Sequence, residues 1–363
     1  MNIYLHRIQN QQVPKSKFKT PAEVLSWLGG IQGQDFSGAK WSIGLRLQNF
    51  TESEIEQEIN KMTIVKSWLM RGTLHFAASK DIRWLLDLLA PKIIKGGAGR
   101  FRGLELNDST FKKSRKLIIN FLKDRNQYTR NEIFTMLRKS GISTAGQRGI
   151  HILWKFALDG LICYGPLIAK QQTFVLLDEW IPDTKNIERS RALAELAKRY
   201  FFSRGPATLQ DFVWWSGLKI SDAQIGLDAI MKNLEKEILD GIVYWYKPIE
   251  SVNKKNIGTF MLPGFDEYLL GYKNKYGTLD QKYIQLICPG KNGLFNPTII
   301  NDGQLIGIWK KVFKKNMVIV APEPFTQFSE VEKKSITKSA DLYGKYLEMP
   351  VEIYWNSKIY FYV

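Results

Sequence analysis

Two glutamines separated by one glycine, Gln32 and Gln34, follow an amphipathic segment near the start of the chain. A neutral amide is a poor acid, base or nucleophile, but two amides can hold and orient one water molecule. Beside a nucleic-acid-binding surface, this pattern indicates hydrolysis of a bond that is already primed to break. The alternative is two polar side chains in a loop that take no part in chemistry.

The local backbone decides whether the two amides can converge. In a helix, residues i and i+2 point about 200° apart, whereas in an extended segment they point the same way. The pair Gly29-Gly30 favours the end of a helix just upstream, and Gly33 lets the chain turn freely. We therefore expect an extended segment that begins after a helix and carries both amides.

The composition favours a globular protein with a polyanionic partner. The chain has 363 residues, of which 44% are hydrophobic, and this length allows two or three domains. It carries 52 Lys and Arg against 35 Asp and Glu, a net charge of +17. Such an excess favours DNA, RNA or an anionic membrane surface as the partner, while solubility alone is the alternative.

Several classes of protein are disfavoured by what the sequence contains. Cys163 and Cys288 each lie in an apolar run, which indicates reduced thiols and a cytoplasmic protein. The three histidines are scattered, without a partner at metal-ligand spacing, so we expect neither a metal nor another cofactor. The first residues lack an apolar signal core, and no run approaches the ~20 apolar residues of a membrane span.

The middle of the chain contains a divergent repeat. The first copy has a helix near Phe111–Lys123, a second helix opened by the capping spacing Thr129-x-x-Glu132, and a third starting near 143–146. Strands are expected at Leu161–Tyr164 and Thr173–Leu177. Three short helices followed by a two-stranded hairpin is the plan of a winged helix-turn-helix.

The second copy repeats this order. Its helices are expected at Ser190–Phe202, after Thr208-x-x-Asp211, and from Ser221, and its hairpin at Ile242–Tyr246 and Thr259–Leu262.

Both ends of the chain add further elements. Capping patterns at Thr20 and Thr51 open two N-terminal helices, and Trp68–Ala77 is expected to form a strand or hairpin with a turn at Gly72-Thr73. One helix near Ser329–Leu347 interrupts a tail whose expected strands are Tyr283–Cys288, Gln304–Trp309, Asn316–Val320 and Lys358–Val363.

The fold class predicted from these elements is α+β, with tandem winged helix-turn-helix domains and a β-rich C-terminal part. The expected domains are a winged-helix-like N-terminal domain at residues 1–108, which carries the Gln-x-Gln motif, two winged-helix domains at 109–183 and 184–266, and a β-rich domain at 267–363.

A basic surface is expected around the first repeat. Residues 92–148 contain fourteen Lys and Arg against four Asp and Glu. Within the glycine-rich stretch 95–103, Phe101 stands between Arg100 and Arg102, where it could stack on a base while the glycines let the backbone approach phosphates. The alternative is a flexible connector that happens to be basic.

The third helix of the first copy has a polar face suited to phosphates and base edges in a major groove, formed by Gln147, Arg148, His151 and Lys155. The matching face of the second copy would repel phosphates, since it holds Asp222, Gln224, Asp228 and Glu235. We therefore predict that the first copy binds DNA and that the second is mainly scaffold.

The sequence resembles the winged-helix DNA glycosylase superfamily of the AlkZ and YcaQ type, whose members remove alkylated bases and unhook interstrand crosslinks. The resemblance spans nearly the whole chain. It is carried by several motifs in the same order, at Ile31–Gln34, Trp68–Phe76, Arg204–Gly217, Pro263–Tyr272 and Asp302–Trp309.

The resemblance implies which residues form the active site. The family signature is Gln, an aliphatic residue, then Gln or Asp, so Gln32 and Gln34 take the catalytic positions, although Gly33 replaces the aliphatic residue. Asp35 would add negative charge near the cationic sugar or cap the next helix. Arg71 and His75, on the shared Trp68–Phe76 motif, would contact DNA nearby, or His75 would be structural.

Three functions follow as alternatives. The first is a monofunctional DNA glycosylase, without metal or cofactor, acting on alkylated or crosslinked double-stranded DNA near the nucleoid. The second is a non-enzymatic tandem winged-helix DNA-binding protein such as a regulator, which a sequence-specific operator would favour. The third is a basic assembly module for protein or RNA. The sequence indicates neither membrane association nor an obligate protein partner.

Overall fold

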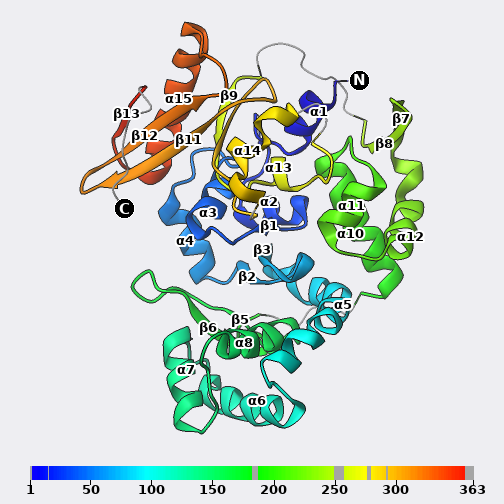
Figure 1. Ribbon diagram of the computed structural model, residues 1–363, viewed down its shortest axis with the longest axis vertical. Helices are drawn as coiled ribbons and strands as arrows, with labels where there is room; N and C mark the ends of the chain where they lie inside the picture. The colour runs from blue at the N-terminus through cyan, green and yellow to red at the C-terminus, as the bar shows by residue number, and fades with distance from the viewer. Residues whose placement is uncertain are drawn as a thin grey trace.

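The computed structural model describes residues 2–14, 16–181, 187–248, 257–275, 279–291 and 293–355. Within these residues it is a mixed α/β structure, with helices packed around four separate sheets (Figure 1). In the part of the chain that is described, no helix is both long enough and apolar enough to cross a membrane. The strand expected at Lys358–Val363 lies outside the described residues.

The N-terminal part begins with helices whose ends are set by local capping. Thr20 and Thr51 each form a complete capping box with the glutamate three residues on, and the first helix of the two ends at Gly29 in the left-handed conformation, as expected. The elements are α1 (Ile3–Asn10), α2 (Pro21–Leu28), α3 (Phe36–Gly44) and α4 (Glu52–Asn60).

A small antiparallel sheet in the N-terminal part carries the Gln-x-Gln motif. Strands β2 (Ile64–Trp68) and β3 (Leu74–Ala78) form a hairpin whose connection contains the expected turn residues Gly72-Thr73, but its first strand lies before the expected segment Trp68–Ala77. Strand β1 (Ile31–Gln32) pairs with the other edge of β3. Gln32 therefore has the expected extended conformation, but Gln34 lies in the bend after the strand, so the expectation of one extended segment carrying both amides is wrong for Gln34. The sheet lies at the centre of the molecule (Figure 1).

Helix α5 (Ile82–Gly103) runs from this sheet toward the first repeat. The glycine-rich stretch 95–103 is its last part, so the alternative of a flexible connector is wrong. Phe101 is 8% exposed and packs edge-on against Phe111 and Trp154, which rules out the expected base stacking in this conformation. A side chain at Gly97 would meet the ring of Trp154 at 3.0 Å, so glycine there permits close packing.

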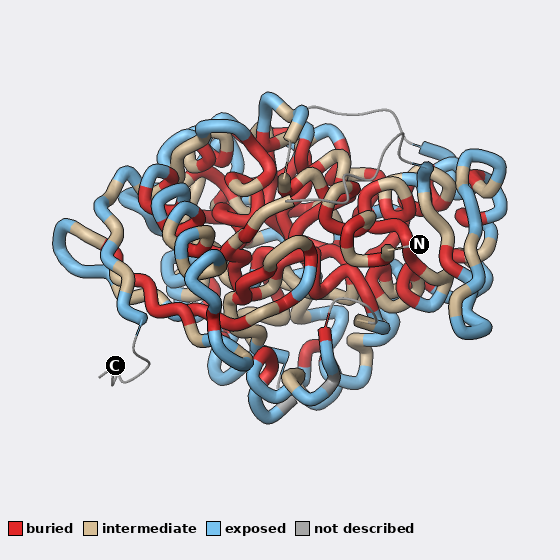
Figure 2. Tube along the Cα trace, turned by 90° about the horizontal axis from the view of Figure 1, so that it is seen from above, coloured by how far each residue is buried: buried red, intermediate tan, exposed pale blue. Residues whose placement is uncertain are grey.

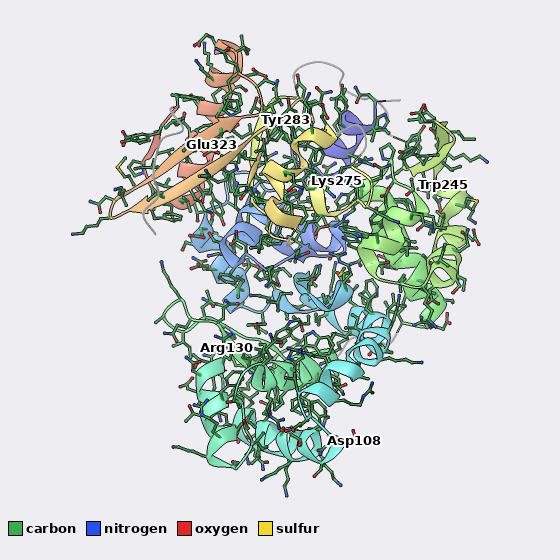
Figure 3. The ribbon with its side chains drawn as sticks, in the orientation of Figure 1. Asp108, Arg130, Trp245, Lys275, Tyr283 and Glu323 are labelled. Carbon is green, nitrogen blue, oxygen red and sulfur yellow. The ribbon has the colours of Figure 1, made fainter. Side chains whose placement is uncertain are left out.

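The first repeat folds much as the sequence predicts. It contains α6 (Asp108–Leu122), α7 (Arg130–Lys139) and α8 (Arg148–Leu158), and a sheet in the order β4-β6-β5 made of Tyr128–Thr129, Thr173–Leu176 and Ile162–Tyr164. Figure 1 shows it as a distinct lower unit, and Figure 3 labels Asp108 and Arg130 in it. Its third helix begins at Arg148, slightly later than expected.

The second repeat has the expected helices but a different hairpin. The helices are α10 (Arg189–Arg204), α11 (Leu209–Ser216) and α12 (Ile220–Ile230). Strand β8 (Ile242–Tyr246) pairs with β7 (Glu235–Leu239) through the turn Asp240-Gly241. The predicted partner, β9 (Thr259–Leu262), instead pairs with β10 (Thr298–Asn301) of the C-terminal sheet, so that prediction is wrong.

The C-terminal sheet has the order β13-β12-β11-β10-β9, with β11 (Gln304–Lys314), β12 (Met317–Pro324) and β13 (Val351–Ile353). Helix α15 (Glu330–Leu347) covers it, as expected. The strand predicted at Tyr283–Cys288 is wrong, because that stretch contains the short helix α14 (Ile284–Ile287). Two further short helices are α9 (Leu177–Trp180), which follows the first repeat, and α13 (Glu267–Leu270).

The N-terminal helices and the C-terminal sheet share one hydrophobic core. It contains Leu28 and Ile31 from the motif region, Trp309 and Val320 from the sheet, and Tyr343 from α15, all at most 1% exposed. Buried segments fill the interior of the molecule, and exposed segments lie around its edge (Figure 2). The two ends of the chain therefore support the central sheet together.

Candidate active site and nucleic-acid interface

The two glutamines lie in different environments. Gln32 pairs with His75 across the central sheet and is 8% exposed, whereas Gln34 is exposed in the bend between β1 and α3. Asp35 is the N-cap of α3 and accepts a hydrogen bond from the Gly38 N–H at 3.0 Å. The capping alternative for Asp35 is therefore confirmed. The amide of Gln32 is thus in the protein interior, and that of Gln34 is at the surface.

A buried ion pair holds the backbone of Gln32. Oε1 of Glu267 accepts a hydrogen bond from the Gln32 backbone N–H at 3.2 Å. Its Oε2 accepts one from Nη2 of Arg204 at 2.6 Å and one from the Trp215 indole at 2.9 Å. Glu267 and Arg204 are both at most 1% exposed. Residues far apart in sequence thus fix the position of the motif strand.

A second buried ion pair lies next to the first. Asp266 accepts hydrogen bonds from both terminal nitrogens of Arg46 at 2.9 Å, and from the Ser42 hydroxyl at 2.5 Å. Burial alone would raise the pKa of the Asp266 carboxyl, but Arg46 and these hydrogen bonds hold it below its usual value. Sequence reasoning missed both pairs, although Glu267 and Asp266 stand in the shared Pro263–Tyr272 motif.

Arg71 connects the motif to the second repeat. Its Nη2 donates to Oε1 of Gln32 at 3.3 Å, and its Nη1 donates to the carbonyl oxygens of Trp214, at 3.4 Å, and Trp215. The guanidinium also lies over the Trp214 ring, 4.9 Å from its centroid. Trp215 is fully buried. Arg71 therefore contacts the proposed catalytic segment directly.

His75 is fully buried and does not face a surface on which DNA could lie. Its Nδ1 lies 2.9 Å from the carbonyl oxygen of Thr73, which requires the proton on Nδ1. Burial, with the positive charge of Arg71 acting in the same direction, lowers the pKa of His75 to about 4. The ring is therefore neutral at pH 7 and lies beside Gln32 in the sheet.

The space beside Gly33 is already filled. The Gly33 N–H donates to the carbonyl oxygen of Leu74 at 2.7 Å, and a Cβ on Gly33 would lie 3.3 Å from Cδ2 of Phe76. Phe76 is fully buried against Phe36, with ring centroids 5.8 Å apart. The glycine is thus matched to a large neighbour, and its hydrogen bond fixes the backbone between the two glutamines.

Replacing Gly33 by isoleucine is expected to lower the free energy of unfolding by about 1–3 kcal/mol, because the larger side chain must displace Phe76. Urea denaturation of both proteins measures this difference. A Gly96→Ala control in α5, where a Cβ meets nothing within 4 Å, is expected to keep or raise stability. A Gly33→Ile protein as stable as the original would contradict the close packing of Gly33 against Phe76.

A basic cleft of about 490 Å³ lies between α5, α8 and the β2–β3 turn. Its basic lining residues come from three elements far apart in sequence and are Arg71, Lys92, Arg100 and His151. The remaining lining residues are Ile93, Gly96 and Gly97 of α5, Trp154 of α8, and Gly217 of the second repeat. Among the described residues that line the cleft none is acidic, so its charge suits a phosphate group.

The predicted DNA-contacting residues fall into two groups. Arg100 and His151 line the cleft, and Arg100 donates to the side chain of Gln147. Arg148, by contrast, donates to backbone carbonyls of Ser143 and Leu104, and Lys155 pairs with Asp159. Arg102 is exposed on the last turn of α5 but does not line the cleft. Arg100 and His151 therefore lie together at the cleft, whereas Arg148 and Lys155 interact with other groups of the protein.

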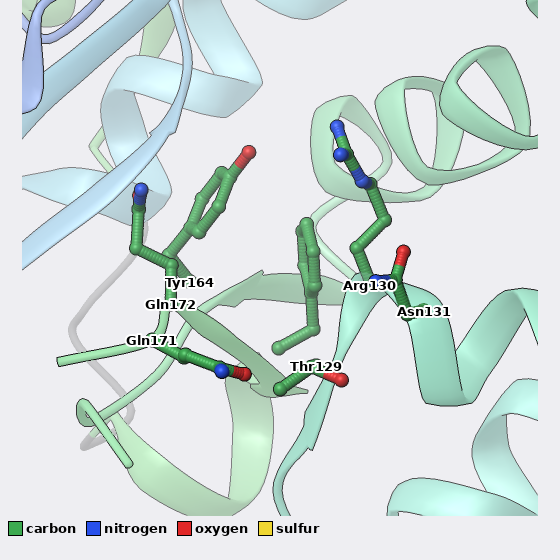
Figure 4. A pocket seen from close by; sticks show the side chains of 7 residues that line it. Thr129, Arg130, Asn131, Tyr164, Gln171 and Gln172 are labelled. Carbon is green, nitrogen blue, oxygen red and sulfur yellow. The ribbon is translucent and has the colours of Figure 1, made fainter. Parts of the chain in front are cut away.

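A second, polar pocket of about 240 Å³ lies within the first repeat (Figure 4). It is lined by the start of α7, including Arg130 and Asn131, and by Tyr164 and Gln172 of the β5–β6 segment. The amine of Lys66 donates to Gln172 at 2.6 Å and lies over the Tyr164 ring. Burial lowers the pKa of Lys66 to about 8. Sequence reasoning singled out none of these residues.

Comparison with known proteins places the chain in a family. The family described as "DNA glycosylase AlkZ-like" matches residues 25–346. The "Interstrand DNA cross-link repair glycosylase" of Streptomyces sahachiroi is 24% identical over 358 residues, which cover 93% of this chain and 94% of that protein.

The solved structure of the Streptomyces sahachiroi DNA glycosylase AlkZ has a similar fold. It superposes with a TM-score of 0.77 at 23% sequence identity, covering 97% of this chain and 98% of that one. At this identity the superposition shows the fold, while the family match covers most of the sequence. The chain belongs to the AlkZ-like family of DNA glycosylases.

Proposed function

We propose that this protein is a monofunctional DNA glycosylase that hydrolyses the N-glycosidic bond of cationic alkylated purines in duplex DNA and unhooks interstrand crosslinks. The observation that carries the proposal is a Gln-x-Gln segment held by Glu267 and Arg71, with Arg71 also lining a cleft of basic side chains. Interstrand crosslinks appear in the name of the Streptomyces sahachiroi relative. That this chain acts on them too is part of the proposal.

Hydrolysis of this N-glycosidic bond can be catalysed by two neutral amides, because the leaving base needs no acid. An N7- or N3-alkylated purine carries a positive charge, so it leaves with the electrons of the C1′–N bond without being protonated. Water then forms the new C1′–O bond and releases a proton to solvent. The enzyme has mainly to position that water and to stabilise an oxocarbenium-like sugar. In this scheme the exposed Gln34 orients the water and Gln32 assists.

We further propose that each repeat is a winged-helix domain. In the first repeat, three helices precede a sheet in the order β4-β6-β5, and the second repeat combines three helices with the β7–β8 hairpin. We propose divisions at 108/109 and 183/184 and a third one after the β7–β8 hairpin rather than at 266/267, because β9 pairs with β10 of the C-terminal sheet. The N- and C-terminal parts are joined through their common core. Association with the nucleoid is part of the same proposal, since duplex DNA is the proposed substrate.

Replacing Gln34 by alanine is expected to lower the rate of base release by about 100-fold, the usual scale for losing one oriented hydrogen-bonding group in an active site. Because Gln34 is exposed, its loss should not alter folding. The measurement is single-turnover release of an N7-alkylguanine from duplex DNA, with a Gln48→Ala variant as the control for an exposed glutamine on another segment. Release at the original rate would remove Gln34 from the mechanism.

A further inference from the structure

We propose that Arg71 is a positioning residue that fixes which edge of the Gln32 amide faces the substrate, so that the two glutamines have different roles. This inference rests on the proposed glycosylase function. It assigns Gln32 as a hydrogen-bond donor and leaves Gln34 as the acceptor for the attacking water.

The orientation of the Gln32 amide follows from the chemistry of its neighbour. A guanidinium group has only donors, so the Gln32 atom that lies 3.3 Å from Nη2 of Arg71 must be the carbonyl oxygen. The backbone N–H of the same residue is held by Glu267 at 3.2 Å. With its carbonyl turned toward Arg71 and its backbone fixed, the Gln32 side chain presents its NH₂ group on the opposite edge.

Arg71 itself is held firmly. Its guanidinium donates to two carbonyl oxygens at the C-terminal end of α11, where the helix dipole favours a positive charge, and it lies over the Trp214 ring. Its backbone has a φ of 56°, a left-handed conformation that non-glycine residues rarely adopt. A Cβ on Gly217 would lie 3.3 Å from Cγ of Arg71, so the second repeat packs directly against this side chain.

The different exposures of the two glutamines support a division of roles. Gln32 is 8% exposed and linked to Arg71, whereas Gln34 is exposed. A water molecule held between them accepts a hydrogen bond from the NH₂ group of Gln32 and donates one to the carbonyl oxygen of Gln34. One lone pair of the water then remains for C1′. Arg71 acts only through Gln32 and does not itself touch the water.

The test is a double-mutant cycle on single-turnover base release from a duplex with one N7-methyl-2′-deoxyguanosine, with DNA affinity measured for each protein. Arg71→Ala is expected to slow release by about 10- to 100-fold, the cost of a small misplacement in an active site. In the Gln32→Ala background the same change should alter the rate less than about 2-fold, because residues that act as a unit are not additive.

Two more variants separate positioning from folding and from DNA contact. Arg71→Lys keeps the charge but cannot reach the α11 carbonyls and Gln32 at once, so DNA affinity should persist while release stays slow. Gln32→Glu, which keeps an acceptor and loses the NH₂ group, should be as slow as Gln32→Ala. Arg189→Ala is the matched control, since Arg189 also bridges elements, through Asp222 and the Leu88 carbonyl.

The outcomes are distinguishable. A full effect of Arg71→Ala in the Gln32→Ala background, a loss of DNA affinity without a slower step, or wild-type release by Gln32→Glu overturns the positioning role while the glycosylase function stands. A comparable slowing by Arg189→Ala also overturns it, because a general structural effect would then explain the loss. Absence of base release by the unmodified protein overturns the proposed function and this inference with it.

Discussion

Replacing Glu267 by alanine is expected to lower the free energy of unfolding by about 3–5 kcal/mol, because it leaves the guanidinium of Arg204 buried without a counter-charge. Both residues are at most 1% exposed, and the pair is joined at 2.6 Å. The Trp215 indole and the Gln32 backbone N–H would lose their acceptor in the same variant. The expected loss is a large share of the ~5–15 kcal/mol that stabilises a typical protein.

Urea denaturation followed by circular dichroism measures this loss. The matched control is Glu330→Ala, which removes a glutamate whose ion pair with Lys333 lies on the surface, with the Glu330 side chain 88% exposed. Such exposed pairs contribute about 0–1 kcal/mol. If Glu267→Ala lowers stability no more than the control does, the buried pair does not hold the motif strand.

The second large effect is expected at the basic cleft. Changing both Lys92 and Arg100 to glutamate should weaken binding to duplex DNA by about 10- to 100-fold at moderate salt, since two phosphates lose their cationic partners and two repulsive charges are introduced. Both side chains are exposed, and both line the cleft. The slope of log affinity against log salt concentration should fall by about 2, one unit for each phosphate that is no longer neutralised.

The matched control carries the same change in charge elsewhere. Lys232 and Lys236 are exposed on the second repeat, and their replacement by glutamate should leave both affinity and salt slope nearly unchanged. Fluorescence anisotropy with a labelled duplex gives both quantities. Equal weakening by the two double variants would mean that only net charge matters, and stronger weakening by the control would move the DNA-binding surface to the second repeat.

Local signals in the sequence predicted the helices well. The capping boxes at Thr20, Thr51, Thr129 and Thr208 are all present, because a cap involves groups only three residues apart. The hairpin of the second repeat was assigned to the wrong partner, yet it had a local signal. Asp240-Gly241 has positive φ at both residues, as a tight two-residue hairpin turn requires.

Two other errors came from ambiguous patterns. The short apolar run Tyr283–Cys288 suits a strand and a buried helical turn equally well, and the structure contains the helical form. The glycines of 95–103 suggested a loop, but Gly97 allows α5 to pack against Trp154. Neither packing partner could be identified from the neighbouring sequence.

In the candidate site, too, local sequence identified some residues but not their distant partners. Gln32 and Gln34 could be identified from their residue types, their spacing and the family resemblance. The groups that hold Gln32 could not, because Arg71 and Glu267 are 39 and 235 residues away in sequence. Likewise, the sequence predicted Arg100 and His151 as DNA-binding residues, but their convergence with Lys92 depends on how α5 packs against α8.

The most direct test of the glycosylase function is release of the free base from duplex DNA that carries a single N7-alkylguanine. The unmodified protein is compared with a Gln32→Ala/Gln34→Ala variant at concentrations that give equal occupancy of the DNA. The proposed mechanism predicts release by the unmodified protein and at least a ~100-fold slower reaction in the variant. Binding without release by the unmodified protein, on this duplex and on a crosslinked one, would contradict it and favour a DNA-binding protein without catalytic activity.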